Sequence, residues 1–368
     1  MVDRVKGPSY MALVVIFLLA AGPVSSFGTV PARASQPLSA PRFSLPGYLN
    51  SVAATSPSNV WAVGGTGASI PEALIIHWNG KKWARQPTPV IKWSSLRAVA
   101  ASSASDAWAV GAVNVANLPM LILHWNGKRW RRVPTPFPRY GGSLYGVAAV
   151  SPTDAWAVGQ VAVAAGVFST LILHWNGKAW RHVRSPGAGF TLNSIAAASA
   201  TLAWAVGNSA FPRRSFTARW NGRTWKHVKS PSPAGLTNIL SGVAIAGKDS
   251  AWAVGWHDQG QLVLHWNGKA WRRVHIPGAA LFGVAAAPGG TAWAVGQATF
   301  DSTYLRIEKY NGKIWQRVTV PASARIGELG GIAAPSRTSA WAVGTTDQNT
   351  SRTLILHWNG RSWAVARQ

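Results

Sequence analysis

The chain contains no cysteine among its 368 residues. Disulfide bridges, thiolate metal sites and a lipid-modified cysteine are therefore excluded. Acidic residues are scarce as well, because 10 Asp and Glu stand against 36 Lys and Arg, which gives a formal net charge of +26. Such a balance keeps a protein soluble and attracts polyanions, but it does not identify the polyanion.

The N-terminal segment lacks an apolar run long enough to cross a bilayer. Residues 11–21 are apolar and follow Arg4 and Lys6, which is the pattern of a secretory signal peptide. We expect cleavage after Ser26 or Ala34, so that residues 1–34 are the signal, a short linker runs to about residue 45, and residues 46–368 form the folded domain. The protein is then secreted and extracytoplasmic. The alternative is an uncleaved N-terminal anchor, the only case in which we expect membrane association.

One unit of about 48 residues recurs seven times. A leucine, from Leu49 to Leu329, lies twelve residues before each WAVG, and a further Trp lies five residues after each WNG or YNG. The WAVG motifs begin at Trp61, Trp108, Trp156, Trp204, Trp252, Trp293 and Trp341, and the WNG or YNG motifs at Trp78, Trp125, Trp175, Trp220, Trp266, Tyr310 and Trp358. A period of this length is typical of a propeller blade.

Each unit predicts four short strands, so the fold class is all-β: a seven-bladed β-propeller with four antiparallel strands per blade and about one repeat per blade. The Asn-Gly pair predicts a two-residue type I′ turn between the third and fourth strands, with Trp125 opposite Lys128 and Leu123 opposite Trp130. The last unit ends with a fourth strand at residues 361–367. We therefore expect the ring to close by packing of the seventh blade on the first. The Trp at repeated positions, 20 of 22, are predicted to fill the core between blades.

The repeated histidines are predicted to be structural. Five of the nine His precede the WNG tryptophan, and two blades carry Arg219 or Lys309 at that place instead. A metal ligand would not be replaced by Arg, so we expect no metal and no cofactor. Asp106 and Asp154, two residues before WAVG, are interpreted as turn residues.

Loop lengths separate the scaffold from a variable surface. The spacing from Leu to WAVG and from WNG to the next Trp is the same in all seven units, whereas the other two connections vary. Both variable connections emerge at one end of the blades, here called the variable-loop face, where function usually lies. The candidate ligand-binding residues on it are Trp93, Tyr140, Phe211, Arg213, Arg214 and Trp256. The alternative is that these aromatic side chains pack the loops onto the ring.

Five carboxylates also fall on the variable-loop face and form the only enzyme-like group: Glu72, Asp258, Asp301, Glu328 and Asp347. Hydrolases need two carboxylates at a defined separation, so these residues are the candidate catalytic set of an alternative, carbohydrate-active hydrolase. Since loop acids are usually solvated, we expect a protein without catalytic activity.

Much of the positive charge falls on the fourth strands, which carry 20 of the 36 Lys and Arg. Charged edge strands resist edge-to-edge pairing, which is one explanation of the charge. The other is a cationic belt that grips an anionic polymer. Export removes the usual nucleic-acid target, so none is expected.

The repeat form VAAVSPTDAWAVG…TLILHWNGKAW resembles uncharacterised exported bacterial propellers rich in WAVG and HWNG units, from Leu49 to Trp363. More distantly the layout is similar to sialidase-like and photosystem II assembly-factor-like propellers, but the Asp-box is absent because Trp78 holds its Asp place. The resemblance implies the fold. We expect a tryptophan-rich, monomeric binding protein for an anionic polysaccharide, a cell-surface polymer or a protein. A further alternative is a scaffold for envelope assembly.

Overall fold

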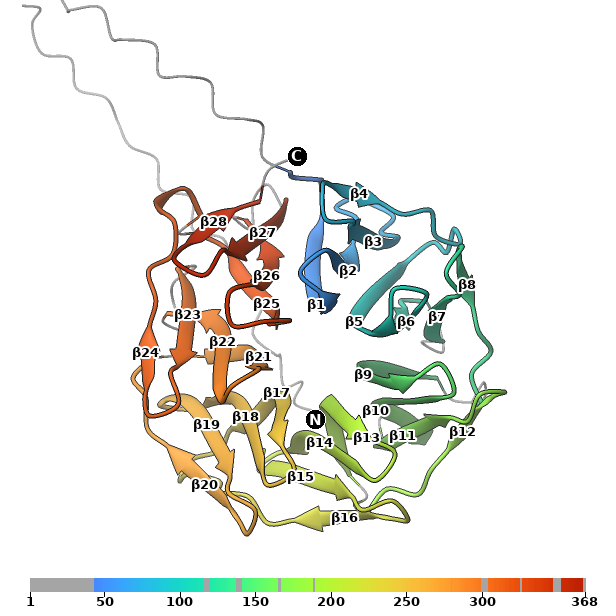
Figure 1. The fold of residues 1–368 in the computed structure, drawn as a ribbon. Helices are drawn as coiled ribbons and strands as arrows, with labels where there is room; N and C mark the ends of the chain where they lie inside the picture. Colours follow the sequence, from blue (N-terminus) through green and yellow to red (C-terminus); the bar gives the residue numbers. More distant parts are fainter. Residues whose placement is uncertain are drawn as a thin grey trace, which may run out of the picture. The chain divides into compact units, whose positions relative to one another are not determined.

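The computed structural model describes residues 43–366, except 116–118, 137–140, 165–166, 188, 279, 299–303, 325 and 347–351. In the described residues, 28 strands form seven four-stranded antiparallel sheets around a central axis (Figure 1). The predicted fold class is confirmed. These residues include no α-helix, only a 3-10 turn at Ala322–Ala324, and none of them forms a helix that could span a membrane. The predicted signal peptide lies outside the described residues.

Each sheet follows the chain order, so each repeat supplies one blade. Blades one to three contain β1 (Tyr48–Ser56), β2 (Asn59–Gly65), β3 (Ala73–Trp78), β4 (Trp83–Arg85), β5 (Ser94–Ser103), β6 (Asp106–Val113), β7 (Met120–Trp125), β8 (Trp130–Arg132), β9 (Gly142–Ser151), β10 (Asp154–Ala164), β11 (Val167–Trp175) and β12 (Trp180–His182). Blades four and five contain β13 (Phe190–Ser199), β14 (Leu202–Ser209), β15 (Ser215–Trp220), β16 (Trp225–Val228), β17 (Asn238–Gly247), β18 (Ser250–His257), β19 (Gly260–Trp266) and β20 (Trp271–Val274). Blades six and seven contain β21 (Ala280–Ala287), β22 (Thr291–Gln297), β23 (Leu305–Tyr310), β24 (Trp315–Arg317), β25 (Glu328–Ala333), β26 (Ala340–Thr345), β27 (Thr353–Trp358) and β28 (Trp363–Val365). First strands face the axis and fourth strands form the outer edge (Figure 1).

The repeated aromatic residues fill the interfaces between blades, as predicted. The buried WAVG tryptophan of one blade contacts the WNG aromatic residue and the fourth-strand Trp of the next. Trp61, for example, lies 5.1 Å from Trp125 and 5.2 Å from Trp130, measured between ring centroids. The same trio occurs at all seven interfaces. Truncating one buried Trp typically costs about 3–5 kcal/mol, so these trios are a main source of stability.

The turn between the third and fourth strands differs from the predicted type I′ turn. Gly127 has φ +85°, but Asn126 does not have positive φ, because Trp93 is the one non-glycine residue of the described chain that does. The Asn126 carboxamide oxygen instead accepts the backbone N–H groups of Lys128 and Arg129 at 3.1 Å each. The connection therefore spans four residues.

This longer connection changes the predicted strand pairing. Trp125 pairs with Trp130 rather than with Lys128, and Leu123 pairs with Arg132 rather than with Trp130. The two indoles are 6.0 Å apart, so they still share one face of the blade. The prediction failed because the asparagine side chain satisfies two backbone donors and so stabilises a different turn.

The ring closes by packing of the seventh blade on the first, as predicted, with Trp341 5.3 Å from both Trp78 and Trp83. A second set of contacts between the first and last parts of the domain was not predicted. The segment before β1 crosses to blade seven, where the Phe43 N–H bonds to Ala366 O at 3.3 Å and the Thr353 N–H bonds to Leu45 O at 2.9 Å. Residues 43–46 therefore act as a clasp that links the start of the domain to its last blade.

Candidate functional site

At one place on the variable-loop face, two described loops are joined by hydrogen bonds. This corner, called the Phe211 corner, comprises residues 209–214 between β14 and β15, residues 235–238 before β17, and Asp258 after β18. Loops from the fourth and fifth blades therefore meet there. Three of the six candidate ligand-binding residues, Phe211, Arg213 and Arg214, lie in it.

The 209–214 loop is closed by its own polar groups. The Ser209 N–H donates to Arg214 O at 3.0 Å, and the Ser209 hydroxyl accepts the Arg214 N–H at 2.9 Å. The same hydroxyl donates toward Pro212 O at 2.9 Å. A single serine thus fixes both ends of the loop that carries Phe211.

The loop is also bonded to the linker that enters the fifth blade. The Arg213 N–H donates to Leu236 O at 2.8 Å, and the Asn238 N–H donates to Arg213 O at 2.9 Å. The Arg214 guanidinium donates to Gly235 O at 3.1 Å. These bonds join two connections that are more than twenty residues apart in sequence.

Asp258 anchors the linker from the other side. Its carboxylate accepts the Leu236 N–H at 2.6 Å and the Thr237 N–H at 3.2 Å. The backbone hydrogen bond from Leu236 holds the pKa of Asp258 below its usual value. Gly235, at φ +125°, passes so close that a Cβ there would lie 2.4 Å from the carboxylate. Asp258 therefore acts as a charged clamp on backbone groups.

This frame exposes two apolar side chains and two arginines, beside the exposed Asp258, whose carboxylate accepts hydrogen bonds from the linker backbone. Phe211 is 74% exposed and Leu236 is 57% exposed, and both arginines are exposed as well. In the described part of the chain, no acidic group pairs with the Arg213 guanidinium. An ordered loop that exposes a phenylalanine beside cations is suited to contact an acidic segment with an apolar side chain.

The remaining candidate ligand-binding residues are not gathered at this corner. Trp93 belongs to the linker before β5, is 42% exposed, and has φ +60°, an uncommon conformation for a bulky residue. Trp256 is half-buried in β18, where it pairs with Ile239 and Gln261. Tyr140 lies outside the described residues. Leu236 was not predicted, although the sequence carries one signal for it: it is the only leucine in a polar linker that contains Pro and Gly, residues 229–237.

The candidate catalytic acids have separate surroundings. Glu72 takes part in backbone bonding with Thr66, whose N–H donates to Glu72 O at 2.9 Å. Glu328 begins β25, and burial raises the pKa of its carboxyl. Asp301 and Asp347 lie outside the described residues. Within the described ranges, no group of three or more His, Asp and Glu could hold a metal ion.

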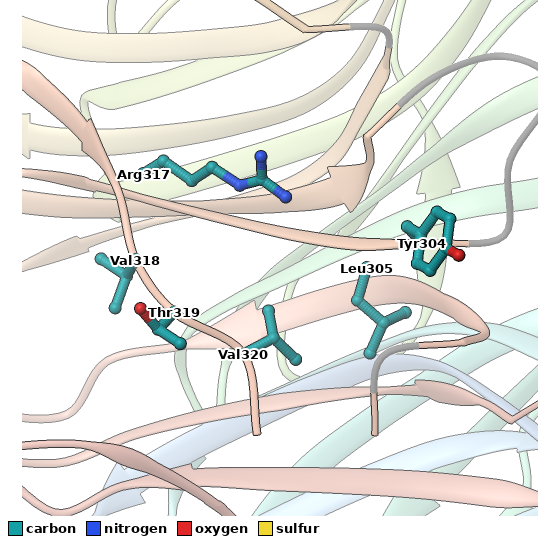
Figure 2. Close-up of a pocket in the computed structure, with 6 residues that line it drawn as sticks. All are labelled: Tyr304, Leu305, Arg317, Val318, Thr319 and Val320. Atoms are coloured by element: carbon teal, nitrogen blue, oxygen red, sulfur yellow. The ribbon is translucent and has the colours of Figure 1, made fainter. Parts of the chain in front are cut away.

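A hollow of about 490 Å³ lies at the outer part of the sixth blade (Figure 2). Its wall consists of Tyr304, Leu305, Arg317, Val318, Thr319 and Val320. These residues include one cation and no carboxylate, so they do not supply the paired acids of a glycoside hydrolase.

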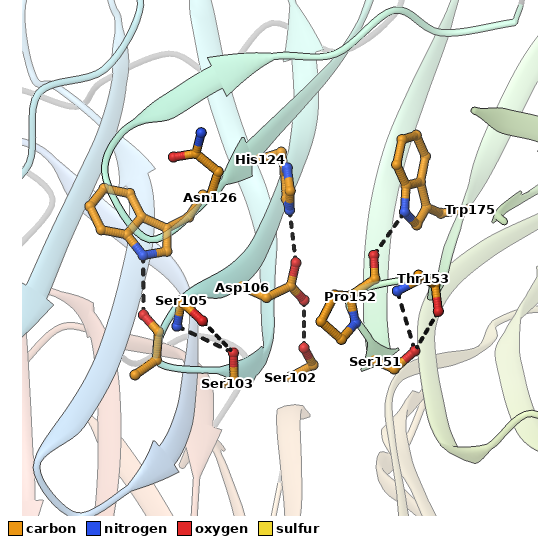
Figure 3. A network of polar contacts seen from close by, with 12 residues as sticks. Ser102, Ser103, Ser105, Asp106, His124, Asn126, Ser151, Pro152, Thr153 and Trp175 are labelled. Atoms are coloured by element: carbon orange, nitrogen blue, oxygen red, sulfur yellow. Dashed lines mark hydrogen bonds and ion pairs between the residues drawn. The ribbon is translucent and has the colours of Figure 1, made fainter. Parts of the chain in front are cut away.

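The repeated histidines have the structural role that was predicted (Figure 3). His124 stacks on Trp108 with 4.0 Å between ring centroids, and its Nε2 lies 2.8 Å from Asp106 Oδ1. Asp106 and Asp154, interpreted as turn residues, each close the turn between the first and second strands, and each also bonds to the His of its own blade, which was not predicted. The physical reason is the register of β6 and β7, which pairs His124 with Trp108 and leaves Asp106, two residues before Trp108 on the same face, within reach of the imidazole.

Ser102, Asp106 and His124 are the residue types of a catalytic triad, but their hydrogen bonds run in a different order from those of a triad. Ser102 donates its hydroxyl hydrogen to Asp106 Oδ2 at 2.5 Å, so the aspartate lies between serine and histidine. In a triad the histidine must lie between the other two, because it removes the proton from the serine. The arrangement therefore ties together two strands and a turn.

No family model and no curated protein matches the chain. Among solved structures, it is similar to YCF48 bound to D1 peptide, with 14% identity, a TM-score of 0.51, and coverage of 74% of this chain and 81% of that chain. The RRP9 WD40 repeats give 13% identity, a TM-score of 0.58 and coverage of 86% and 98%. The β-propeller domain of the Trilobed protease from Pyrococcus furiosus gives 9% identity, a TM-score of 0.56 and coverage of 88% and 96%. These similarities show the β-propeller fold.

Proposed function

We propose that this propeller is a non-catalytic interaction protein, and that its Phe211 corner binds an acidic segment of a partner protein. The observation that carries the proposal is the exposure of Phe211 and Leu236, next to two arginines, on loops held by a dense set of hydrogen bonds. A pre-ordered surface loses little conformational entropy on binding. Exposed apolar side chains on such a surface commonly mark an interaction site.

The exposed apolar side chains of Phe211 and Leu236 favour a protein partner over a polysaccharide. Leu236 offers no hydrogen bond to a sugar hydroxyl, whereas it can contact an apolar side chain of a peptide. The solved structure of YCF48 is a complex with D1 peptide, so a propeller of similar fold binds a peptide. An anionic glycan or cell-surface polymer remains the alternative ligand, because the same arginines would serve it.

The net charge of +26 supports an acidic partner, since a charge of this size raises the association rate of acidic molecules. With residues 1–34 as a signal peptide, the partner would be an extracytoplasmic protein. A hydrolase acting through Glu72, Asp258, Asp301, Glu328 and Asp347 is the second reading. The clamp made by Asp258 counts against a catalytic role for that residue.

The test compares corner variants with a charge-matched control. The probes are three fluorescent 12-residue peptides: one acidic with a central Phe and Leu, one acidic without them, and one neutral with both. An acidic polysaccharide, polygalacturonate, is the fourth probe. The control is R131Q/R132Q, which removes two exposed arginines from the outer strand β8.

We expect the parent protein to bind the acidic apolar peptide best. R213Q/R214Q should weaken that binding at least tenfold, about 1.4 kcal/mol, while R131Q/R132Q changes it little. F211A and L236A should abolish the preference for the apolar peptide. An equal loss of affinity in R213Q/R214Q and R131Q/R132Q would show that the peptide responds only to the overall positive charge. Tighter binding of polygalacturonate than of any peptide would replace the protein partner with a glycan.

A further inference from the structure

The first strand of every blade contains a β-bulge at the same place. The residue directly after the repeated leucine pairs with no residue of the second strand, as the register shifts show. A bulge turns a side chain away from its ordinary direction. The seven bulged residues are Asn50, Arg97, Tyr145, Asn193, Ser241, Phe282 and Gly330, and all of them line one cavity of about 200 Å³ on the propeller axis.

The residue directly after each bulged residue is small. It is Ser, Ala or Gly in all seven blades. A Cβ at Gly331 would lie 2.8 Å from Ser51 Cα, and one at Gly146 would lie 3.0 Å from Ile195 N. Neighbouring backbones therefore meet there. The bulged position, by contrast, changes from blade to blade, and it supplies all the charged, amide and aromatic side chains of the lining.

The cavity carries one charge. Its lining includes Arg97 and no acidic residue. The Arg97 guanidinium carbon lies 5.1 Å from the centre of the Tyr145 ring, and the side chain is exposed to the cavity. Within the described chain no carboxylate neutralises this guanidinium. The site therefore has the charge to balance a single anionic group.

Hydrogen bonds fix the two asparagines of the ring. Asn50 donates through Nδ2 to Leu96 O at 2.7 Å, and Asn193 donates through Nδ2 to Leu240 O at 2.9 Å. Each bond reaches the next blade, so the side chains are ordered before any ligand arrives. Phe282, from the sixth blade, adds an aromatic surface to a ring whose cation comes from the second blade.

We propose that the central cavity binds a small organic monocarboxylate, with its carboxylate on Arg97 and its apolar part against Phe282. A single guanidinium matches one carboxylate in charge and geometry, whereas a phosphate dianion would keep an unbalanced charge. The volume is below the roughly 300–1,000 Å³ of pockets that take drug-sized molecules, so the ligand is small. This site is separate from the Phe211 corner and does not depend on the proposed function.

The test uses the full chain with acetate, butyrate and benzoate, and with acetamide and benzamide as uncharged controls. Binding is measured by calorimetry and ligand-observed NMR in 150 mM NaCl. We expect saturable one-site binding of the carboxylates, with benzoate the tightest, and no binding of the amides. R97Q should weaken benzoate at least tenfold, and F282A should weaken benzoate more than acetate.

Two controls keep the result clear. R132Q removes an exposed arginine of the outer edge, and R213Q/R214Q removes the corner cations, and both should bind benzoate like the parent protein. If R97Q lowers the thermal midpoint, R97K tests the same contact, because it keeps the charge but loses the planar guanidinium and should bind more weakly. Absence of saturable binding, or unchanged binding by R97Q, would overturn the proposal.

Discussion

The position before each WNG or YNG motif shows what a single residue does in this repeat. Where His is replaced, Arg219 lies 5.7 Å from the Trp204 ring centre, and Lys309 lies 5.0 Å from that of Trp293. His, Arg and Lys share an apolar body and a polar end, and all three can lie over an indole. The position therefore supports the interface between blades rather than proton transfer.

Three of these histidines make stability depend on pH. Burial lowers the pKa of His77, His265 and His357 below the usual 6.5. The unfolded chain therefore takes up protons at a higher pH than the folded one, and stability is lost as pH falls through 6.5 toward the folded pKa. We expect the free energy of unfolding in urea to fall between pH 7.5 and 5.

The variant H77Q/H265Q/H357Q should show a smaller fall over the same range, because it lacks the three groups. Each differential proton contributes up to about 1.4 kcal/mol per pH unit, so the difference between variants is measurable. H275Q serves as the control, since His275 is exposed. An identical pH slope in the parent and triple variants would contradict the prediction.

At the scale of one element, β23 departs from its sister strands. Third strands elsewhere bury apolar pairs such as Leu121 and Leu123, but β23 carries Arg306 and Glu308 at those places, 7% and 2% exposed. Arg306 Nε donates to Glu308 Oε1 at 2.6 Å, and its Nη2 donates to Pro277 O. Burial raises the pKa of Glu308, and the Arg306 charge opposes this shift. The two substitutions compensate each other.

The pair should therefore be strongly coupled in a double-mutant cycle. E308L leaves a buried guanidinium without its carboxylate, and R306L leaves the reverse, so each should cost about 3–5 kcal/mol of unfolding free energy. R306L/E308L restores the leucines of the second blade and should be close to the parent protein or more stable. Guanidinium-chloride unfolding measures all three. A double variant as unstable as the sum of the singles would show that the pair is not coupled.

The strands and their grouping into seven blades were the part of the structure most readily predicted from the sequence. The repeated leucine, WAVG and WNG positions predicted all seven blades, because each marks a buried position with a fixed spacing. The turn register was not predicted, because Asn-Gly is compatible with two turn types and the Asn126 side-chain bonds decide between them. The bulge after the leucine was missed as well, although its column of differing residues is visible in the repeats.

At the scale of the whole molecule, the two candidate sites depend on contacts between blades. The Phe211 corner joins two loops through the bond between Arg213 and Leu236, and the central cavity needs one residue from each of the seven blades. Sequence reasoning placed the variable loops on one face but could not say which loops touch. These contacts follow from the order of blades around the ring and not from the repeat itself.

The clasp at residues 43–46 occupies the place that a linker between blades has elsewhere. Pro46 forms an isolated β-bridge with Arg352, just as Lys92 in the linker before β5 does with Glu72. Arg352 also donates to Ser44 O at 3.0 Å. The start of the domain thus contacts the seventh blade at one linker position, and the described contacts across the seam between the seventh and first blades are non-covalent.

Removing the clasp should therefore open the ring at this seam. A chain that starts at residue 47 loses the buried Phe43, which packs 6.4 Å from Trp83, and should lose about 3–5 kcal/mol relative to a chain that starts at residue 40. Hydrogen exchange should accelerate first in β27 and β28, because the last blade is no longer tied to the start of the domain. The variant W61A is the comparison, since it weakens an interface that a covalent linker still spans, and it should not expose β28. Equal exchange of β28 in the two chains would show that the Trp341 trio closes the ring without the clasp.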